Sequence, residues 1–330
     1  MSNSVQCVLC PLLCTLAPRE RGRCSVRLNV DGELVSLVYG RPVAVNIDPV
    51  EKKPLFHFMP GIDVFSIATA GCNLKCEFCQ NWEISQAAPE DMTSYDMPPE
   101  AVVENALSYG CEAIAYTYTE PVVFFEYTRD CARLAREAGI KNILVTAGYI
   151  NPGPLSELAE YIDAANVDLK SISDTYYRNI CGGTLQPVLD TITYLKRSGT
   201  WLEVTNLIVP TLNDEPDEID ILSRWVLDNT GEDTPLHFSR FFPMYRLTDL
   251  APTPIDTLRG ARERAMEIGL NYVYVGNAVT AEGMITRCPE CGATLIARQG
   301  YMITENNIMN GNCGNCLAPV AGVWGGMEEQ

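Results

Sequence analysis

The sequence predicts an α/β fold built on a parallel sheet, because β-rich runs and helical patterns alternate between residues 64 and 275. Repeated strand–helix units favour parallel strands joined by right-handed crossovers. Six or seven strands are too few for a closed eight-stranded barrel, so a partial barrel or an open doubly wound sheet fits better. In either arrangement we expect the functional site at the carboxyl ends of the strands. The strand-like runs cover residues 64–69, 112–118, 142–146, 166–169, 202–209, 236–241 and 271–275.

The helical stretches between these runs are bounded by the residues that commonly begin and end helices. Prolines lie near several starts, and glycines follow the ends at Gly110, Gly139, Gly199 and Gly269. We therefore expect residues 60–284 to form a central α/β domain. The helical stretches cover residues 99–109, 122–138, 155–162, 187–198, 218–228 and 255–268.

Cysteine-rich segments flank the central domain on both sides. Residues 1–59 are expected to form an N-terminal segment with a β-hairpin, because Asp31 and Gly32 separate two β-rich runs. Residues 285–330 contain two C-x2-C pairs and are expected to form a small C-terminal module. Cys111 and Cys131 lie in apolar patterns and are expected in the core. Eleven of the fourteen cysteines fall into three groups, which are Cys7, Cys10, Cys14 and Cys24; Cys72, Cys76 and Cys79; and Cys288, Cys291, Cys313 and Cys316.

Composition argues against several classes of function. The formal net charge of −18 disfavours nucleic-acid binding, because phosphate contacts need clustered Lys and Arg. The first residues lack the basic and apolar segments of a signal peptide, and no apolar run is long enough to span a membrane. We therefore expect a cytoplasmic protein with no nucleic-acid or membrane partner. In a reducing compartment, clustered cysteines are more often metal ligands than disulfides.

The cysteines of GCNLKCEFCQNW have the spacing C-x3-C-x2-C and directly follow the first strand of the central domain. Three thiolates can hold three irons of a [4Fe-4S] cluster and leave the fourth iron open, whereas structural zinc is normally closed by four ligands. Cys72, Cys76 and Cys79 are therefore the candidate catalytic metal ligands. A loop of buried or zinc-binding cysteines is the alternative.

The two outer groups of cysteines predict further metal sites. The paired C-x2-C knuckles near the C-terminus are typical of one tetrahedral zinc or a rubredoxin-like iron, which would supply much of the folding energy of so short a segment. An auxiliary redox centre is the alternative there. The N-terminal group has the less regular spacing C-x2-C-x3-C-x9-C and could hold zinc or an auxiliary iron–sulfur cluster.

Polar residues also follow later strands of the predicted sheet. Asp168 and Lys170 lie on the same side of their strand, at the mouth of the sheet, where they could bind a zwitterion or form a plain salt bridge. Thr119 and Glu120 precede a helical stretch and could act as its cap and first turn. His237 begins a strand, a position where a lone histidine is usually a satisfied core residue.

The motifs together resemble those of a known superfamily. The three-cysteine motif, with Phe78 just before its last cysteine, resembles radical S-adenosylmethionine (SAM) enzymes, and residues 60–280 resemble their pyruvate formate-lyase activating enzyme-like branch. More narrowly, CVLCPLLC, IDPVEKKPLFHF, ATAGCNLKCEFCQNW, YTYTEP, NVDLKS and the C-terminal knuckles resemble the AmmeMemoRadiSam system radical SAM enzymes. The resemblance implies a partial (β/α)6-type radical SAM barrel with small cysteine-rich metal-binding modules at both ends.

The resemblance also implies which residues bind SAM beside the cluster. Thr119 and Glu120 stand where these enzymes carry a Gly-Gly-Glu-Pro-like turn, although Tyr118 and Thr119 replace the glycines. Asp168 and Lys170 match a D-x-K of the activating enzymes. The implied cofactor-binding residues are Phe78, Thr119, Glu120, Asp168, Lys170, Thr205 and His237.

The sequence thus predicts a radical SAM oxidoreductase of an anaerobe. Such an enzyme cleaves SAM reductively to methionine and a 5′-deoxyadenosyl radical, which abstracts hydrogen from a protein or small-molecule substrate. It needs an electron donor of the flavodoxin or ferredoxin type. Activation of a glycyl radical enzyme is one alternative for the substrate. A non-catalytic metal-binding scaffold is the alternative from another class, and it predicts zinc in every site and no turnover of SAM.

Overall fold

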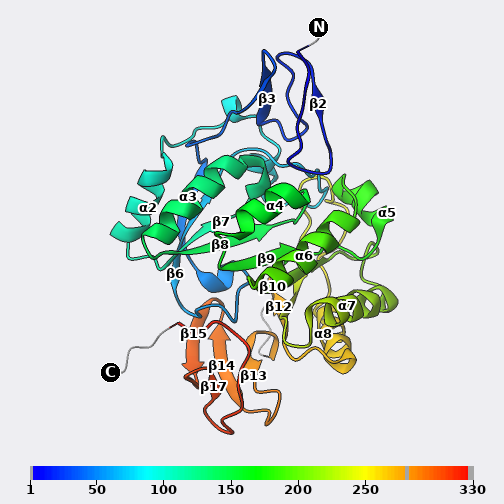
Figure 1. Ribbon diagram of the computed structural model, residues 1–330. Helices are drawn as coiled ribbons and strands as arrows, with labels where there is room; N and C mark the ends of the chain where they lie inside the picture. Colours follow the sequence, from blue (N-terminus) through cyan, green and yellow to red (C-terminus); the bar gives the residue numbers. More distant parts are fainter. Residues whose placement is uncertain (1–2, 279–281, 326–330) are drawn as a thin grey trace.

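An eight-stranded sheet forms the centre of the protein, whose computed structural model describes residues 3–278 and 282–325. The strands follow one another across the sheet in sequence order, from β5 at one edge to β12 at the other (Figure 1). All neighbours from β6 to β12 pair in parallel. The strands are β5 (Ala44–Pro49), β6 (Asp63–Ala68), β7 (Ala113–Tyr116), β8 (Lys141–Thr146), β9 (Ala164–Asp168), β10 (Trp201–Ile208), β11 (Leu236–Arg240) and β12 (Val273–Gly276).

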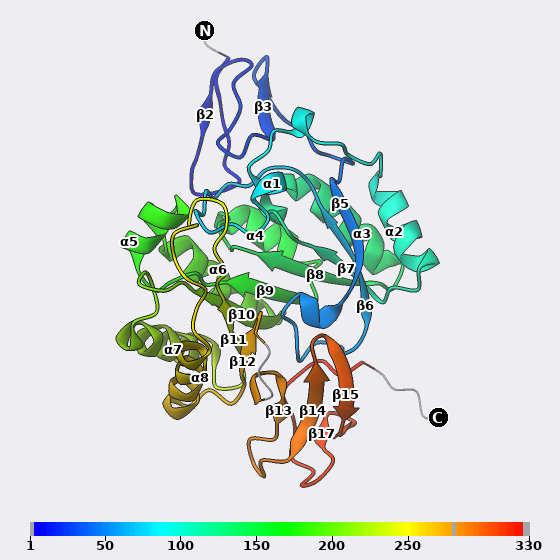
Figure 2. The same ribbon diagram turned by 180° about the vertical axis from the view of Figure 1, so that it is seen from behind.

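This strand order decides between the two arrangements that the sequence predicted. A doubly wound sheet reverses its order at a switch point and carries helices on both faces. A sheet whose strands advance in one direction places every crossover helix on the same face. Figures 1 and 2 show the helices over one face of the sheet, so the central domain is a partial barrel. The helices are α2 (Pro99–Ser108), α3 (Phe125–Glu137), α4 (Pro152–Ala159), α6 (Gln186–Ser198), α7 (Pro216–Thr230) and α8 (Ile255–Ile268).

The strand β5 was not predicted. It belongs to the expected N-terminal segment 1–59, but it pairs antiparallel with β6 and is an edge strand of the central sheet. The sheet therefore begins inside that segment rather than at residue 60. An antiparallel edge strand needs no crossover helix, so the strand–helix alternation from which the sheet was predicted contains no sign of it.

Two small hairpins at the N-terminus lie at the end of the molecule opposite the C-terminal module (Figure 1). The first pairs β1 (Val5–Gln6) with β2 (Thr15–Leu16), and the second pairs β3 (Arg27–Val30) with β4 (Glu33–Ser36). The second is the hairpin predicted from Asp31-Gly32. Both turn residues have positive φ, +53° and +100°, as a two-residue turn of this kind requires.

The C-terminal module packs against the loop between β5 and β6. Its strands are β13 (Thr286–Arg287), β14 (Thr294–Gln299) and β15 (Met302–Asn306) in one antiparallel sheet, and the short pair β16 (Ile308–Met309) and β17 (Asn312–Cys313). The buried Arg298 donates to the Phe56 carbonyl at 2.7 Å, and its guanidinium lies 4.2 Å from the centre of the Phe56 ring. The His57 carbonyl accepts from the Val323 amide at 2.7 Å. These contacts join the module to the central domain.

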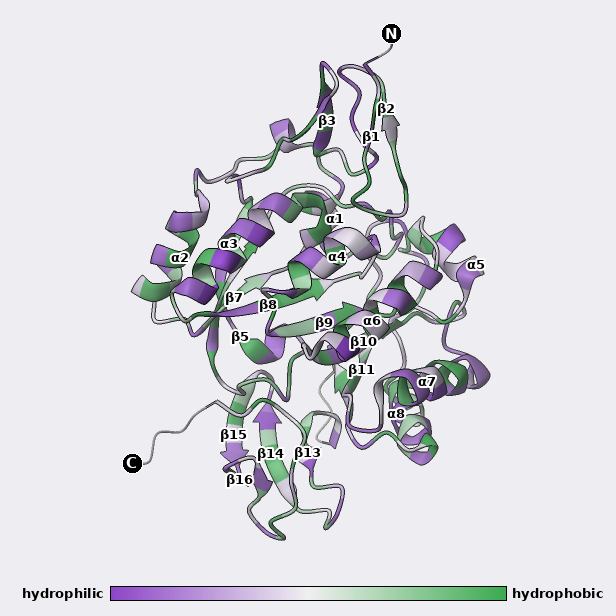
Figure 3. Ribbon diagram, in the orientation of Figure 1, coloured by the Kyte–Doolittle hydropathy of each residue, from purple (hydrophilic) through white to green (hydrophobic). Residues whose placement is uncertain are grey.

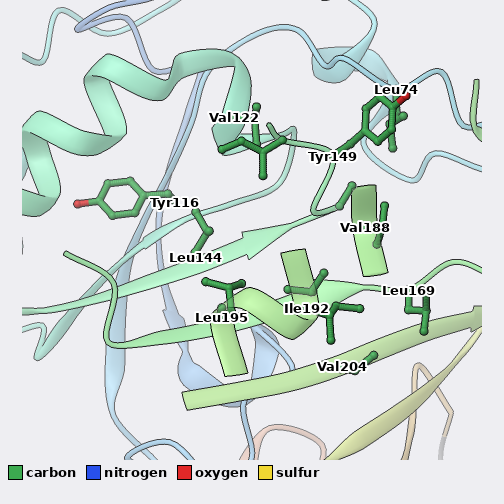
Figure 4. Close-up of a cluster of buried hydrophobic side chains, with 14 of the residues drawn as sticks. Leu74, Tyr116, Val122, Leu144, Tyr149, Leu169, Val188, Ile192, Leu195 and Val204 are labelled. Carbon is green, nitrogen blue, oxygen red and sulfur yellow. The ribbon is translucent and has the colours of Figure 1, made fainter. Parts of the chain in front are cut away.

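The main core lies between the sheet and its layer of helices. Figure 3 shows apolar strands under helices with polar outer faces. Figure 4 shows Leu144 of β8, Ile192 and Leu195 of α6, and Val204 of β10 packed together in this layer, and all four are buried. Cys111 and Cys131 are also buried, as predicted, at 4% and 0% exposure. No helix within the described ranges is long and apolar enough to cross a membrane.

Candidate active site

The carboxyl ends of the parallel strands surround a cavity of about 390 Å³, a size typical of small-molecule sites. Its walls come from the loop after β6, the ends of β7 to β12, residues 51–56 and the C-terminal module. Glu120 is the one predicted residue of the central site that does not line the cavity within the described chain. The others all do: Cys72, Cys76, Phe78, Cys79, Thr119, Asp168, Lys170, Thr205 and His237.

The loop with the three cysteines leaves β6 at Ala68 and is held by backbone contacts. Gly71 has a φ of +90°, and a β-carbon there would lie 2.5 Å from the Cys24 carbonyl oxygen, so the chain passes only because this residue is glycine. Lys75 donates its amide to the Cys181 carbonyl at 2.8 Å, and Glu77 donates to Ile180 at 3.0 Å. These bonds fix the loop to a π-helical turn, Tyr177–Cys181, which follows α5 (Asp174–Tyr176).

Each of the three thiols has a polar neighbour that could tune a bound cluster. The Leu74 amide donates to Cys72 Sγ at 3.4 Å, and the Ser85 hydroxyl lies 3.1 Å from Cys79 Sγ. The neighbouring Cys181 thiol lowers the pKa of Cys76. Hydrogen bonds to the ligand sulfurs are among the factors that set the reduction potential of an iron–sulfur cluster.

The distances between the thiols of the central loop distinguish this site from one that binds a single ion. Bonds of about 2.3 Å place the thiolates of a tetrahedral zinc about 3.8 Å apart. Within the described residues, the C-terminal set is the only group of three or more potential ligands whose atoms all lie within 4.8 Å of one another. The three thiols of the central loop do not meet this condition for a single ion. Their donor set of three thiolates fits a [4Fe-4S] cluster with one open iron.

Asp168 and Lys170 form the ion pair expected from their alternation at the end of β9. Lys170 Nζ lies 3.0 Å from Asp168 Oδ2 and 5.7 Å from the centre of the Phe78 ring. Burial lowers the pKa of Lys170, but Asp168 and the thiols of Cys76 and Cys181 raise it more, so the net direction is upward. The pair therefore presents a fixed cation and a partly exposed carboxylate to the cavity.

Glu120 lies behind the cavity wall, and both oxygens of its carboxylate accept internal hydrogen bonds. Oε1 accepts from the Thr146 hydroxyl at 2.5 Å and from the Val122 amide at 3.2 Å, and Oε2 accepts from the Ala147 amide at 2.8 Å. Glu120 itself, rather than Thr119, is the N-cap of the following turn. The Thr119 hydroxyl instead donates to the Thr69 carbonyl at 2.9 Å. Glu120 therefore ties the end of β7 to the end of β8.

Thr205 and His237 line the cavity from adjacent strands but differ in their hydrogen bonding. The Thr205 hydroxyl is buried and has no partner among the described residues, which leaves it free to bind a ligand. His237 Nε2 lies 2.6 Å from Glu203 Oε2, and its ring packs edge-on against Phe56 at 4.9 Å. Its Nε2 is therefore satisfied within the core, although the residue borders the cavity.

Sequence reasoning assigned no role to one group that lines the cavity and to one group beside it. Lys53 lines the cavity and is 1% exposed; its ammonium binds Asp48 Oδ2 at 2.6 Å and lies over the Tyr118 ring. Burial lowers the pKa of Lys53 to about 8. Cys181 does not line the cavity, but it lies against Cys76 from a loop distant in sequence. The residues Lys52-Lys53 stand inside a recognised motif, but nothing local in the sequence shows that one of two adjacent lysines is buried.

The C-terminal cysteines form a compact four-thiol site. Cys288 Sγ lies 3.6 Å from Cys316 Sγ, and Cys291 Sγ lies 3.7 Å from Cys313 Sγ. These distances match a tetrahedral ion. One cysteine of each knuckle is buried and the other is exposed. The N-terminal group also faces a common cavity, lined by Cys7, Cys10, Cys14 and Cys24, but its thiols are not within this short mutual distance.

Comparison with known proteins agrees with this geometry. Residues 66–223 match the family described as the radical SAM superfamily. Residues 66–223 therefore form a radical SAM superfamily domain. Such a domain implies a [4Fe-4S] cluster and SAM, and the thiols of Cys72, Cys76 and Cys79, with the buried unpartnered hydroxyl of Thr205, fit both.

Sequence relatives extend over much of the chain. An uncharacterized protein of Methanocaldococcus jannaschii is 49% identical over 296 residues, which cover 90% of this chain and 88% of that protein. A pyruvate formate-lyase-activating enzyme of Clostridium pasteurianum is 24% identical over 151 residues, 45% of this chain and 63% of that enzyme. Homology to the activating enzymes is therefore shown, but it is distant.

Solved structures share the fold. A radical SAM methyltransferase from Sphaerobacter thermophilus aligns with a TM-score of 0.53 and 14% identity, covering 66% of this chain and 67% of that chain. Streptococcus suis SuiB, bound to the precursor peptide SuiA, aligns with a TM-score of 0.52 and 16% identity, covering 70% and 52%. At such low identity these similarities establish the architecture of the central domain alone.

Proposed function

We propose that this protein cleaves SAM reductively at a [4Fe-4S] cluster held by Cys72, Cys76 and Cys79. One observation carries the proposal: among the described residues, these three are the only cysteines that line the central cavity, and they lie at the carboxyl ends of the parallel strands. A set of three thiols leaves one iron of a cubane open toward the cavity. When bound, the cluster and SAM supply a 5′-deoxyadenosyl radical that abstracts hydrogen from a substrate.

The residues of β9 are suited to bind the methionine part of SAM. The Lys170 ammonium suits a carboxylate, and the Asp168 carboxylate suits an ammonium. The two groups are 3.0 Å apart and face the same cavity as the cysteines. A zwitterionic ligand can insert next to this pair without leaving either charge uncompensated. Thr205 on the adjacent strand β10 offers a hydroxyl that has no internal partner.

Glu120 acts in this proposal as a positioning residue. Two of its three hydrogen bonds hold the Thr146-Ala147 end of β8 at the cavity wall, where both residues line the site. The resemblance to the family motif implied direct contact with the ammonium of SAM. Because both carboxylate oxygens are already used and the residue is 0% exposed, we propose that Glu120 shapes the pocket through β8.

The remaining walls suit a reaction that must exclude water. Phe56, Phe78 and Val145 line the cavity with apolar surface, and the C-terminal module contributes Met284 and Tyr301. A substrate must approach the same cavity, so we propose that Lys53 and its neighbours contact the substrate rather than SAM. The motifs along the chain support an AmmeMemoRadiSam system enzyme, which acts in the cytoplasm of an anaerobe with an electron donor of the flavodoxin or ferredoxin type.

Activation of a glycyl radical enzyme is a second candidate for the overall reaction. It is favoured by the 24% identity to a pyruvate formate-lyase-activating enzyme. The two candidates share every step up to hydrogen abstraction, so the test of SAM cleavage applies to both. They differ in the hydrogen donor, which is a backbone glycine of a partner protein in the second case.

An anaerobic assay for 5′-deoxyadenosine with SAM and a strong reductant tests the proposal. We expect turnover in the natural protein and in Cys131→Ala, whose cysteine is also buried but lies in α3. We expect none in Cys76→Ala. Undiminished cleavage in Cys76→Ala would refute the assignment of the cluster. Zinc in all three cysteine sites and no SAM cleavage would instead favour the metal-binding scaffold.

A further inference from the structure

The four N-terminal cysteines converge on one cavity although they come from two separate turns. Cys7, Cys10 and Cys14 lie in the loop between β1 and β2, which is closed by hydrogen bonds from the Cys7 amide to the Cys14 carbonyl at 2.9 Å and from the Leu13 amide to the Cys10 carbonyl at 3.1 Å. Cys24 joins them from the turn before β3. Three of the four are buried, and Cys14 is the more exposed one. Convergence of buried thiols without disulfides indicates a metal centre.

The C-terminal site of the same chain provides a standard for judging what kind of centre this is. Its four thiols all lie within 4.8 Å of one another, as a single ion requires. Within the described residues, no three of Cys7, Cys10, Cys14 and Cys24 meet that condition, and neither do the three cysteines of the central loop. In this structure the N-terminal thiols therefore do not meet the spacing of a single tetrahedral ion.

Two buried polar atoms at the cavity lack a partner. Arg27 is 3% exposed; its terminal nitrogens bind Glu126 at 2.6 and 2.5 Å, but its Nε has no acceptor among the described residues. Asn73 is fully buried, and its Oδ1 also has no partner. Both residues line the cavity together with the thiols. An anionic centre of thiolates and sulfide would accept the Arg27 Nε–H, which is costly to bury unpaired, whereas Asn73 Oδ1 is itself an acceptor and gains no partner from such a centre.

The loop of the central cluster forms the wall between the two sites. Asn73 lines the N-terminal cavity, while Cys72, its neighbour in the chain, lines the central cavity. Consecutive α-carbons are about 3.8 Å apart, so the two sites are separated by little more than one stretch of backbone. The loop of the central cluster also touches the N-terminal segment directly, because Gly71 packs on the Cys24 carbonyl. Asn73 Nδ2 donates to the Tyr149 carbonyl at 2.8 Å and so fixes this part of the loop.

We propose that Cys7, Cys10, Cys14 and Cys24 hold an auxiliary iron–sulfur cluster that passes single electrons to the central cluster. In each transfer the auxiliary cluster is oxidised by one electron and the central cluster is reduced by one. An external one-electron donor of the ferredoxin or flavodoxin class then reduces the auxiliary cluster again. The presence of the auxiliary cluster does not depend on the function proposed above, whereas its role as a relay does.

The first experiment tests the cluster itself in the full chain. The variant Cys72→Ala/Cys76→Ala/Cys79→Ala removes the central cluster, and iron and acid-labile sulfide are then measured after anaerobic reconstitution. Sulfide is decisive because a single ion at the C-terminal site contains none. We expect iron and sulfide to remain, with an electron paramagnetic resonance signal after reduction. Adding Cys10→Ala should remove both, whereas adding Cys111→Ala should not.

A second variant guards against misfolding. Cys14→Ser changes the more exposed ligand and should weaken or remove the same signal while circular dichroism stays unchanged. Absence of sulfide from the triple variant, or sulfide that persists after Cys10→Ala and Cys14→Ser, would overturn the auxiliary cluster. Stoichiometric zinc at this site would also overturn it.

The second experiment tests the relay. In Cys14→Ser with an intact central cluster, a reduced ferredoxin should no longer reduce that cluster, as followed by its electron paramagnetic resonance signal. Dithionite, a small reductant that reaches the central cluster directly, should still do so. Equal reduction by ferredoxin in the variant and the natural protein would refute the relay. Failure of the proposed function would be seen separately, as a reduced central cluster that does not cleave SAM.

Discussion

The Lys170 ammonium lies 3.0 Å from the Asp168 carboxylate at the end of β9, and both line the cavity with the three central cysteines. Lys170 is largely buried, whereas the Asp168 side chain is 39% exposed. An ion pair with one partly solvated member contributes little to stability, about 0–1 kcal/mol. Its place at the cavity therefore points to binding rather than to folding.

Replacing Asp168 should separate these two roles. Asp168→Ala should weaken SAM binding, measured anaerobically by calorimetry, while iron content stays near that of the natural protein and stability changes by less than about 1 kcal/mol. Asp220→Ala is a matched control, because Asp220 is 33% exposed and pairs with Arg264 away from the cavity. Loss of folding in Asp168→Ala, with no separate binding defect, would favour a plain salt bridge.

Thr205→Val should change binding and stability differently. The Thr205 hydroxyl is buried without a partner, so its removal should leave the free energy of unfolding unchanged or raise it by about 1 kcal/mol. SAM affinity should fall because the hydroxyl is then missing from the cavity. Thr191→Val is the control, since its buried hydroxyl donates to Gly148 at 2.8 Å and its loss should destabilise without affecting SAM. Unchanged SAM affinity in Thr205→Val would argue against a role in binding.

Cys181→Ala should shift the potential of the central cluster without removing its iron. The Cys181 thiol lies beside Cys76 and lowers its pKa, and a thiol that donates to a ligand sulfur stabilises the more negative, reduced cluster. We therefore expect a more negative midpoint potential in an anaerobic redox titration followed by electron paramagnetic resonance. Cys131→Ala serves as the control. A positive shift, or none with full iron content, would contradict this role.

Removal of the C-terminal metal should loosen the module but leave the central cluster in place. The small antiparallel sheet is held by four thiols and a few buried residues, so metal binding supplies much of its folding energy. Cys313→Ser should increase hydrogen exchange in β14 and β15, and iron bound to the central cysteines should be unaffected. Natural protein with no zinc or iron bound to this module would refute the structural role.

His57 should make the docking of the C-terminal module sensitive to acid. Burial lowers the pKa of His57 to about 4, while Nδ1 lies 2.7 Å from the Ala321 carbonyl and Nε2 lies 2.6 Å from the Tyr274 hydroxyl. The unfolded chain protonates its histidine near pH 6.5, so it binds more protons than the folded chain between pH 6.5 and 4. Stability should therefore fall as the pH falls through this window, by about 3 kcal/mol in total.

Chemical unfolding of the natural protein and of His57→Gln at several pH values measures this effect. The variant lacks the buried imidazole, so the stability advantage of the natural protein should shrink between pH 6.5 and 4. A difference that stays constant across this range would contradict the assignment. His237 is the only other histidine, which simplifies the assignment of their proton resonances.

Much of the fold follows from local patterns in the sequence. The seven parallel strands and their helices lie close to their predicted positions, because a repeating polar and apolar pattern depends on residues only a few positions apart. The end of α8 at Ile268 is one such case, where Gly269 follows with a φ of +122°. The C-terminal knuckles likewise predicted a set of four thiols that lie together in the structure, and the three-cysteine spacing predicted candidate ligands that line the central cavity.

The tertiary structure decided what depends on residues far apart in the chain. It showed a partial barrel with sequential strand order, it added β5 to the edge, and it placed Cys181 against Cys76. It also showed that the Glu120 carboxylate is hydrogen-bonded to β8. Among the described residues, it brought the four C-terminal thiols within 4.8 Å of one another, but no three of the N-terminal ones. The spacing of cysteines in the sequence identifies the residues that could come together. Only the packing of crossovers and loops fixes the distances between them, and those distances decide whether four thiols surround one ion or a cluster.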